Sequence, residues 1–382
     1  QWRYAGPAIN LGNPANPADS AAALTTLFNW FNSVGGANNT SFLTGVAIPG
    51  GNVVIEDSLN SPNAEEFTLG FSKQFSGRGI VRVTAVHRTF GDFYTTRGDL
   101  TTGTVTTPTG LIADRQVIEN NDSAFEREYN GLQAQFQWRF GKKITVGGNW
   151  TLSKLEGNFD GENRNSGPVT GDLTYPEFKV ASWNRPTGDL AADQRHKAAL
   201  YGVYRFWDNT NNALSVSLFQ SFQTGLPYGA VQNVLVRGGT GANAFNFNPV
   251  SGYRQPPSQV AYAFTAIDEF RTDDIFRTDL SLNYTFRFRG AEIFISPEVT
   301  NLFNAQNIDT TDTRGIDLTV NTAANNGTCG NSPTGRCLPF NPYTTTPVEG
   351  LHWQRGANFG KAIAPLGFQT PRTFRVSLGV RF

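Results

Sequence analysis

The sequence is dominated by segments in which apolar and polar residues alternate one by one. Successive side chains of a β-strand point to opposite faces of its sheet, so such a segment predicts a strand with one apolar and one polar face. The clearest example is 276–288, whose polar positions include Arg277, Asp279 and Asn283. The apolar positions of this segment are Phe276, Thr278, Leu280, Leu282, Tyr284, Phe286 and Phe288.

The same alternation recurs along the chain, at lengths that suit a membrane. About nine segments are close to the ~9–11 residues that a tilted strand needs to cross a bilayer. A soluble β-sandwich would bury the Arg, Asp and Gln residues of their polar faces at a high cost in free energy. The pattern therefore predicts an all-β fold, an antiparallel transmembrane β-barrel. The segments are 65–75, 79–90, 132–140, 144–153, 196–206, 213–224, 276–288, 291–301 and 373–382.

Short and long connections alternate strictly between these segments. Bacterial outer-membrane barrels combine short periplasmic turns with long extracellular loops. The sequence therefore predicts a protein of the bacterial outer membrane, with residues 1–64 as an extracellular loop region and 65–382 as the C-terminal strands and loops of a barrel. The short connections are 76–78, 141–143, 207–212 and 289–290, and the long ones are 91–126, 155–195, 225–275 and 302–371.

The composition agrees with a barrel, and the balanced charge does not favour a nucleic acid as partner. The chain contains 31 Lys+Arg and 31 Asp+Glu, so its charge gives no reason to expect a nucleic acid as partner. Hydrophobic residues make up only 38% of the chain and the mean hydropathy is −0.34, yet there are 30 Phe residues. A polar lumen, an apolar lipid face and aromatic girdles account for both properties. No run of about 18 apolar residues predicts a transmembrane helix.

A short helix is predicted within residues 1–64. Asp19 and Ser20 are suitable N-terminal caps for a helix over 21–32, and Gly35 is suited to ending it. Leu27, Phe28 and Phe31 would form its apolar stripe. The stripe either contacts a ligand or packs locally within the loop region, and local packing is the favoured interpretation.

Several motifs resemble those of the TonB-dependent receptor family, in particular its Oar-like branch. Residues Asn301, Leu302, Phe303 and Asn304 resemble the N-L-F-N motif on the penultimate strand of these receptors. The alternating final segment ends in Phe382 and is similar to the signal by which the barrel-assembly machinery recognises its clients. The D-Q-R-H sequence at 193–196 resembles the D-x-R-H strand entry of Oar-like members, and 62–70 resembles a family strand start more loosely.

The resemblance implies a 22-stranded barrel, of which these segments are the last strands. It also implies an N-terminal plug and a segment that binds TonB, and neither is recognisable in this sequence. The plug and the remaining strands are therefore expected from the same polypeptide or from another chain. Further implied partners are outer-membrane lipid, lipopolysaccharide and an unidentified extracellular ligand or protein.

The sequence shows no constellation typical of an enzyme or of a cofactor site. The three histidines are far apart, without metal-ligand spacing. The acidic runs 160–163 and 309–317 match no calcium-loop spacing, so solvated loops are favoured over calcium sites. Cys329 and Cys337 lie close together in a polar stretch and predict a local disulfide, as suits an exported protein.

The long connections contain aromatic and arginine residues of the kind that carry recognition. These residues either bind a ligand or pack the loops against each other, and the sequence leaves both open. Six arginines on the polar strand faces are expected to pair with acidic groups of a plug. The candidate recognition residues are Trp183, Arg185, Tyr228, Tyr253, Arg254, Trp353 and Arg355. The six arginines are Arg139, Arg205, Arg277, Arg287, Arg375 and Arg381.

Three functions are compatible with these observations. The leading hypothesis is an outer-membrane receptor whose complete form takes up a bulky ligand in a TonB-dependent way. The second is a structural or adhesin-like barrel that binds a surface partner through its extracellular loops. The third is a soluble glycan-binding β-sandwich, which leaves the Arg-bearing strand faces unexplained. The sequence does not identify the ligand.

Overall fold

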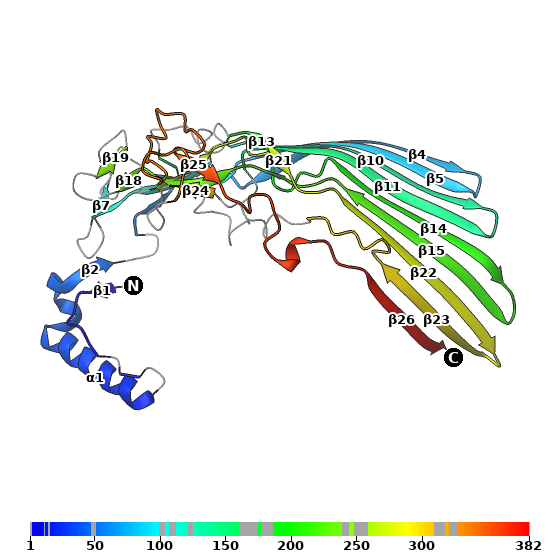
Figure 1. The fold of residues 1–382 in the computed structure, drawn as a ribbon, viewed down its shortest axis with the longest axis horizontal. Helices are drawn as coiled ribbons and strands as arrows, with labels where there is room; N and C mark the ends of the chain where they lie inside the picture. Colours follow the sequence, from blue (N-terminus) through cyan, green and yellow to red (C-terminus); the bar gives the residue numbers. More distant parts are fainter. Residues whose placement is uncertain are drawn as a thin grey trace.

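The computed structural model describes residues 2–10, 12–13, 16–46, 51–98, 104–106, 112–120, 125–159, 175–176, 186–238, 244–247, 259–308, 318–320 and 327–381. Its main feature is an antiparallel sheet in which nine long strands pair in chain order, curved and extended to one side of the molecule (Figure 1). A short tenth strand, β13 (Gly188–Asp189), pairs with one of them. The strand order is β26-β23-β22-β15-β14-β11-β10-β5-β4.

The nine long strands confirm the segments predicted from alternation, and most extend one to five residues further. Each joins its chain neighbour in antiparallel register. Among the described residues the sheet stays open, with β4 and β26 at its edges. The bounds are β4 (Asn63–Phe75), β5 (Gly79–Gly91), β10 (Arg127–Phe140), β11 (Ile144–Gly157), β14 (His196–Asp208), β15 (Asn212–Gln223), β22 (Ile275–Phe288), β23 (Ala291–Thr300) and β26 (Thr373–Arg381).

The alternation of short and long connections is confirmed, and it gives the sheet two different ends. At the short-turn end, strands are joined by tight turns at 76–78, 141–143, 209–211 and 289–290. Arg289 and Gly290 both have positive φ, 48° and 86°, as a two-residue hairpin turn requires. At the long-loop end the connections gather into a separate cluster (Figure 1).

The long connections, together with β3 of the N-terminal region, form small sheets that the sequence did not predict. One four-stranded sheet has the order β12-β6-β9-β3, and the other pairs are β7-β8, β16-β21, β17-β20, β18-β19 and β24-β25. These strands are two to five residues long, too short for an alternation signal. They are β3 (Val53–Ile55), β6 (Tyr94–Gly98), β7 (Thr104–Thr106), β8 (Ile112–Asp114), β9 (Gln116–Asn120), β12 (Tyr175–Pro176), β16 (Pro227–Tyr228), β17 (Val231–Leu235), β18 (Arg237–Gly238), β19 (Phe245–Asn246), β20 (Gln259–Ala263), β21 (Phe270–Arg271), β24 (Leu318–Val320) and β25 (Trp353–Arg355).

The N-terminal region contains the predicted helix, with a different start. Helix α1 (Pro17–Ser33) is capped by Asn16, whose side chain accepts a hydrogen bond from the Ala18 backbone at 3.1 Å. The predicted cap at Asp19–Ser20 was wrong. Pro17 is suited to the first turn of a helix, so the helix begins nearer the N-terminus than predicted. The helix ends before Gly35, which adopts φ 95°. The region also has β1 (Trp2–Tyr4), β2 (Leu43–Val46), η1 (Gly36–Asn38) and η2 (Thr40–Phe42).

The predicted stripe of α1 packs only in part, because among the described residues Phe31 alone of its three members contacts a neighbouring ring. Phe31 contacts Tyr4 with ring centroids 5.0 Å apart, and Trp30 contacts Phe42 at 5.7 Å. Leu27 and Phe28 remain 38% and 57% exposed. In the described residues, no helix is both long and apolar enough to cross a membrane.

The register places the alternating apolar positions of the nine strands on one face, whereas a few apolar residues such as Phe219 and Phe294 lie on the other. Phe222 lies opposite Phe276, Leu218 opposite Leu280 and Ile295 opposite Leu378. This face has no protein covering among the described residues. Even central Leu218 is 47% exposed, and Leu378 on an edge strand is 74% exposed. A contiguous apolar face of this size is rare on soluble monomeric proteins and is typical of a lipid-facing surface.

Aromatic rings gather at both ends of the apolar face, with aliphatic residues between them. Contacts within the short-turn girdle include Phe75 with Trp138 at 5.2 Å and Tyr204 with Phe206 at 4.8 Å. The short-turn girdle consists of Phe75, Trp138, Phe140, Tyr204, Phe206, Trp207, Phe286 and Phe288. The long-loop girdle consists of Phe67, Trp150, Phe222, Phe276 and Phe374.

The opposite face is polar and satisfies part of its own charge. Arg375 pairs with Glu298, directly across the sheet, at 2.8 Å. Arg277 pairs with Asp279 at 3.1 Å. Arg287 pairs with Asp208 at 3.1 Å. Three of the six arginines on the polar face therefore have carboxylate partners within the sheet. The prediction for all six was pairing with acidic groups of a plug.

Candidate recognition site at the long-loop end

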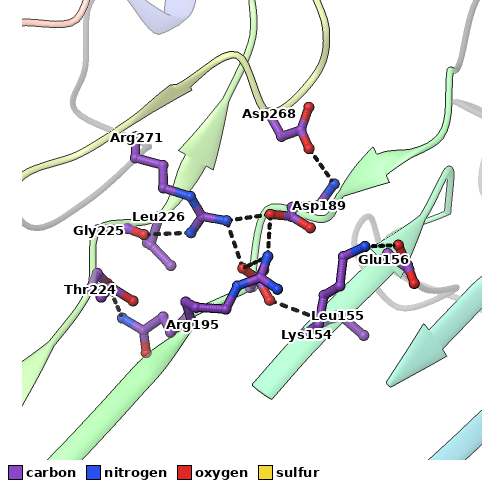
Figure 2. A network of polar contacts seen from close by, with 12 residues as sticks. Lys154, Leu155, Glu156, Asp189, Arg195, Thr224, Gly225, Leu226, Asp268 and Arg271 are labelled. Atoms are coloured by element: carbon purple, nitrogen blue, oxygen red, sulfur yellow. Dashed lines mark hydrogen bonds and ion pairs between the residues drawn. The ribbon is translucent and has the colours of Figure 1, made fainter. Parts of the chain in front are cut away.

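The base of the long connections is held by a cluster of two arginines and two aspartates. Asp193, whose side chain is 0% exposed, accepts a hydrogen bond from Arg271 Nη2 at 2.8 Å. Arg271 also binds Asp189, and Arg195 Nη2 lies 2.6 Å from Asp189 Oδ2 (Figure 2). Burial by itself would lower the pKa of Arg271, but Asp193 and Asp189 outweigh it and raise that pKa. The two guanidinium groups thus face two carboxylates within one cluster.

The same cluster ties backbone from several connections to the end of the sheet. The second oxygen of Asp193 accepts from the Leu155 backbone N–H at 2.8 Å, at the end of β11. Arg271 Nη1 donates to the Gly225 carbonyl at 3.0 Å. The Asp189 backbone N–H donates to Asp268 at 2.9 Å (Figure 2). Segments that are far apart in sequence are thereby fixed at one place beneath the loops.

Above this base, the long connections form two aromatic clusters. In the first, Tyr228 contacts Phe270 at 5.4 Å and Phe359 at 5.9 Å between ring centroids. The guanidinium of Arg355 lies 5.9 Å from each of the Phe270 and Phe359 rings. The arrangement is an aromatic group with a cation beside it, which is attractive through the ring quadrupoles.

The second cluster is a small hydrophobic core. Trp353 stacks on Phe264 at 4.7 Å and is 5% exposed. Phe264 also contacts Phe340, which packs with the buried valines Val234, Val236 and Val260. This core is built from residues of the long connections and contains no residue of the nine long strands.

Several titratable groups of the loop cluster have pKa values shifted by hydrogen bonds or by burial. Glu349 accepts two hydrogen bonds from the Arg355 guanidinium, at 2.8 and 3.1 Å, which lower the pKa of Glu349 and raise that of Arg355. Burial lowers the pKa of His352, whose Nδ1 lies 2.9 Å from the Val348 backbone N–H. Burial also raises the pKa of Tyr343 to about 12. Both His352 and Tyr343 are therefore neutral at pH 7.

Three of the seven predicted recognition residues are brought together here. Tyr228 and Arg355 share the first aromatic cluster, and Trp353 belongs to the adjacent core. Of these, Trp353 is engaged in loop packing, whereas Arg355 is exposed, with 44% of its side chain accessible. Their role in recognition stays a prediction. Trp183, Arg185, Tyr253 and Arg254 lie outside the described residues, as does Phe382.

The motif residues Asn301 to Asn304 form a structural turn at the end of β23. Asn301 and Asn304 adopt left-handed φ values of 49° and 51°, which asparagine tolerates better than most residues. Asn301, 1% exposed, donates to the carbonyls of Ala305 and Thr370 at 2.9 Å each. Phe303 is 76% exposed. The turn ties the end of β23 to the approach to β26.

Of the remaining sequence predictions for this end, the structure tests the disulfide. The disulfide between Cys329 and Cys337 is present and buried. The described residues contain no group of three or more His, Cys, Asp or Glu side chains able to hold a metal ion. The acidic runs 160–163 and 309–317 lie outside the described residues.

In the sequence, Asp193 and Arg195 stand out only as part of the motif 193–196, and no pattern points to Asp189 or Arg271. The residues of the Arg271–Asp189 pair are 82 positions apart, so no local pattern joins them. The one available signal was a cluster of charged residues where long connections meet strand ends. That signal also fits solvated surface charges.

Comparison with protein-family models found no match, and comparison with curated protein sequences found none either. Comparison with solved structures found similarity to the FrpB iron transporter from Neisseria meningitidis (F3-3 variant), with a TM-score of 0.37 and 13% sequence identity. The match covers 67% of this chain and 29% of that chain. The chain thus spans less than a third of the length of that transporter.

Proposed function

We propose that this chain is part of the wall of a bacterial outer-membrane receptor, with the long-loop end outside the cell and the short-turn end in the periplasm. In its complete form the receptor takes up a bulky ligand across the outer membrane with energy from TonB. The observation that carries the proposal is the uncovered apolar face bounded by two aromatic girdles. The resemblance of the motifs Asn301–Asn304 and 193–196 supports the receptor family.

The height of the apolar band supports insertion in a bilayer. Phe276 and Phe286 belong to opposite girdles and are ten residues apart on β22. At about 3.4 Å per residue they are ~34 Å apart along the strand. A strand tilt of about 40° reduces this to ~26 Å of height, close to the ~25 Å band of outer-membrane barrels.

The open edges show what else the proposed receptor requires. Unpaired backbone groups on β4 and β26 would be costly in lipid, because hydrocarbon offers them no hydrogen bond. We therefore infer that further strands pair with both edges and close the barrel. The polar face would then line the lumen, where a plug domain is the expected occupant.

The loop cluster supports binding at the outer surface. Its aromatic core and the Asp–Arg base hold the exposed Arg355 and the half-buried Tyr228 in fixed positions. Aromatic and arginine side chains on a rigid support are typical recognition anchors. The proposal includes the other four predicted residues, Trp183, Arg185, Tyr253 and Arg254, as candidates on the same loops.

The first experiment is to isolate the protein from membranes of the producing bacterium and to determine its intact mass and N-terminal sequence. A detergent-dependent protein much larger than 41.7 kDa, with a plug domain ahead of this segment, is expected. Electrophoretic mobility that changes on boiling would demonstrate a folded barrel. A protein that stays soluble and monomeric without detergent would overturn the membrane assignment.

A second candidate function is a scaffold or adhesin-like barrel. The loop cluster favours it, because a rigid loop platform with its own hydrophobic core suits stable protein contacts as well as transient ligand capture. Uptake experiments distinguish the two functions. If deletion of tonB abolishes accumulation of the bound ligand, the receptor function holds. Binding that proceeds without any TonB-dependent uptake would favour the scaffold.

A further inference from the structure

A groove of about 660 Å³ opens on the apolar face, where β4, β5, β10 and β11 lie side by side near the long-loop end (Figure 1). It runs between two rows of side chains. The inner row, towards the middle of the apolar band, is aliphatic. It belongs to the apolar face, because Leu69 is two residues from Phe67 of the long-loop girdle and Leu152 is two residues from Trp150. The inner row consists of Leu69, Ala85, Leu132 and Leu152.

The outer row lies at the level of the long-loop girdle and is mostly polar. It consists of Phe67, His87, Asn130 and Lys154, which are consecutive partners in the strand register. Backbone between the rows, including that of Gly131, forms the floor. Tyr129 covers Gly131 from the polar face, because a Cβ on Gly131 would lie 2.7 Å from the Tyr129 hydroxyl. The groove therefore opens on the apolar side of the sheet.

Hydrogen bonds hold the outer row in one arrangement. Asn130 Nδ2 donates to Glu128 at 2.6 Å, so Asn130 Oδ1 accepts from His87 Nδ1, which lies 2.8 Å away. With its proton on Nδ1, the neutral His87 ring keeps Nε2 as an acceptor, and no described residue binds it. Lys154 pairs with Glu156 and keeps further N–H donors. The row therefore offers an acceptor and a donor beside an aliphatic groove.

The outer row presents no surplus of positive charge. The ammonium of Lys154 is balanced by Glu156, and Glu128 lies 3.7 Å from His87 Nδ1. Arg195 also lines the groove, and its guanidinium is bound to Asp189 at 2.6 Å. A phosphate group would gain little at this row. Uncharged groups that donate and accept hydrogen bonds are better suited to it.

We propose that this groove holds an acyl chain of lipopolysaccharide, with the amide and hydroxyl groups beside that chain bound to His87 and Lys154. This inference rests on the proposed membrane insertion with the long-loop end outside. A groove within a lipid-facing band takes an acyl chain, and its place near the outer surface selects a lipid of the outer leaflet. An N-linked hydroxyacyl chain has N–H and O–H donors next to its hydrocarbon. The ester-linked chain of a phospholipid has no donor there for His87.

The test uses the full-length protein in phosphatidylcholine vesicles that contain a small, equal mole fraction of one brominated lipid at a time. The probe is a diacylglucosamine 1-phosphate with an N-linked 3-hydroxyacyl chain. The reference is phosphatidic acid with chains of the same length, brominated at the same position. Both lipids carry a phosphate monoester, so they differ mainly in the groups beside the chains.

Bromine quenches a tryptophan that it contacts, and Trp150 lies beside the groove, two residues from Leu152 on the same face. The quenching that belongs to Trp150 is the difference between the wild type and Trp150→Phe. The glucosamine lipid is expected to quench Trp150 roughly fivefold more than phosphatidic acid, as about one additional hydrogen bond would give. In His87→Phe, which keeps a ring without the acceptor, the ratio should fall towards one. An unchanged ratio in that variant would overturn the assignment of the donor to His87.

Two variants of β5 test the position of the site. Ala85→Phe fills the groove between Leu69 and Leu132 and should remove the excess quenching by the glucosamine lipid. The matched control, Val83→Phe, adds the same ring on the same face, two residues further along the strand and outside the groove, and should keep the excess. Equal loss in both variants would overturn a specific site. A boiling-dependent shift in electrophoretic mobility checks that each variant is folded.

The remaining outcomes separate this inference from the proposed function. A ratio of one in the wild type, with clear quenching by both lipids, overturns the lipopolysaccharide site and leaves membrane insertion intact. Stronger quenching by phosphatidic acid would show a phospholipid site in its place. Absence of quenching of any tryptophan by either lipid overturns insertion, and the lipopolysaccharide site falls with it.

Discussion

At the scale of single residues, Asp193 is the fully buried carboxylate of the loop base. Its carboxylate binds Arg271 and the Leu155 backbone N–H, and its side chain is 0% exposed. Removing one partner of a buried ion pair leaves the other charge uncompensated, at a cost of several kcal/mol. The single carboxylate thus controls how two long connections meet the sheet.

Asp193→Asn should lower the free energy of unfolding of the loop base by about 3 kcal/mol, because Arg271 loses a buried charge partner. The measurement is the rate of limited proteolysis in 225–274, together with thermal unfolding in detergent. Asp208→Asn is the control, since Asp208 is 52% exposed in its pair with Arg287 and its loss should cost under about 1 kcal/mol. Equal effects of the two substitutions would contradict the assignment.

Asn301 acts through hydrogen bonds and through its backbone conformation. Asn301→Ala removes two donated bonds and leaves alanine at φ 49°, so a loss of about 2–4 kcal/mol in stability is expected. Asn301→Gly relieves the backbone strain but lacks the same hydrogen bonds. The stability of this variant should therefore lie between that of the wild type and that of Asn301→Ala. Thermal unfolding measures both. Phe303→Ala, at an exposed neighbour, should cost little, and a large effect there would contradict this account.

At the scale of elements, the two faces of one strand should respond oppositely to charge. Leu218 and Ser217 are adjacent on β15, on the apolar and the polar face. Leu218→Arg places a cation near the middle of the apolar band, where it should destabilise the protein by ~2–4 kcal/mol. Ser217→Arg faces the polar side and should be tolerated. Urea unfolding in lipid vesicles measures the difference, and similar losses at both sites would argue against a lipid-facing sheet.

The segment that contains His352 and Glu349 should loosen in acid. Burial lowers the pKa of His352 below 6.5, and hydrogen bonding from Arg355 lowers that of Glu349 below 4.5. Both groups bind more protons in the unfolded segment, so stability rises with pH. The His352 contribution declines as pH falls below 6.5, and the Glu349 contribution declines below 4.5.

Hydrogen exchange of residues 345–360 at several pH values measures this loss. We expect faster exchange, corrected for intrinsic rates, as the pH is lowered through the range of His352. His352→Gln keeps a polar side chain without the titration, so it should remove the step above pH 4.5 while leaving the Glu349 step. A pH-independent exchange rate in the wild type would contradict the prediction.

At the scale of the whole molecule, the two parts depend on different sources of stability. The sheet has its apolar residues on a face that lipid would cover, whereas the loop cluster encloses Trp353, Phe264 and Phe340 in a core of its own. The Asp–Arg base connects the two parts. Unfolding should therefore proceed in separate steps, with the loop cluster free to unfold before the sheet.

Phe264→Ala should destabilise the loop cluster selectively. Phe264 contacts both Trp353 and Phe340, and truncating a large aromatic residue in a core costs ~3–5 kcal/mol. Tryptophan fluorescence should report earlier melting of the loops, while the boiling-dependent shift in electrophoretic mobility stays as in the wild type. Loss of that shift would mean that the two parts fold as one unit.

How much the sequence predicted depends on the element. The alternation along 276–288 predicted both the strand and the face on which Phe276 and Arg277 lie, because the period of two is imposed by the strand itself. The predicted start of α1 was too late, because Asn and Asp are similarly good N-terminal caps and residue type alone does not distinguish Asn16 from Asp19. The β-bulge between Arg205 and Trp207 in β14 corresponds to no pattern in the sequence.

Local patterns along the chain were sufficient to predict the antiparallel strands, the two faces of the sheet, the difference between its ends and the pairing of Cys329 with Cys337. Each of these follows from residues that are neighbours along the chain or along a hairpin. The three-dimensional fold was needed to show that Asp193 meets Arg271 and that Trp353 is buried while Arg355 stays exposed. These contacts join segments tens of residues apart, and their partners are set by the path of the connections and not by any local period.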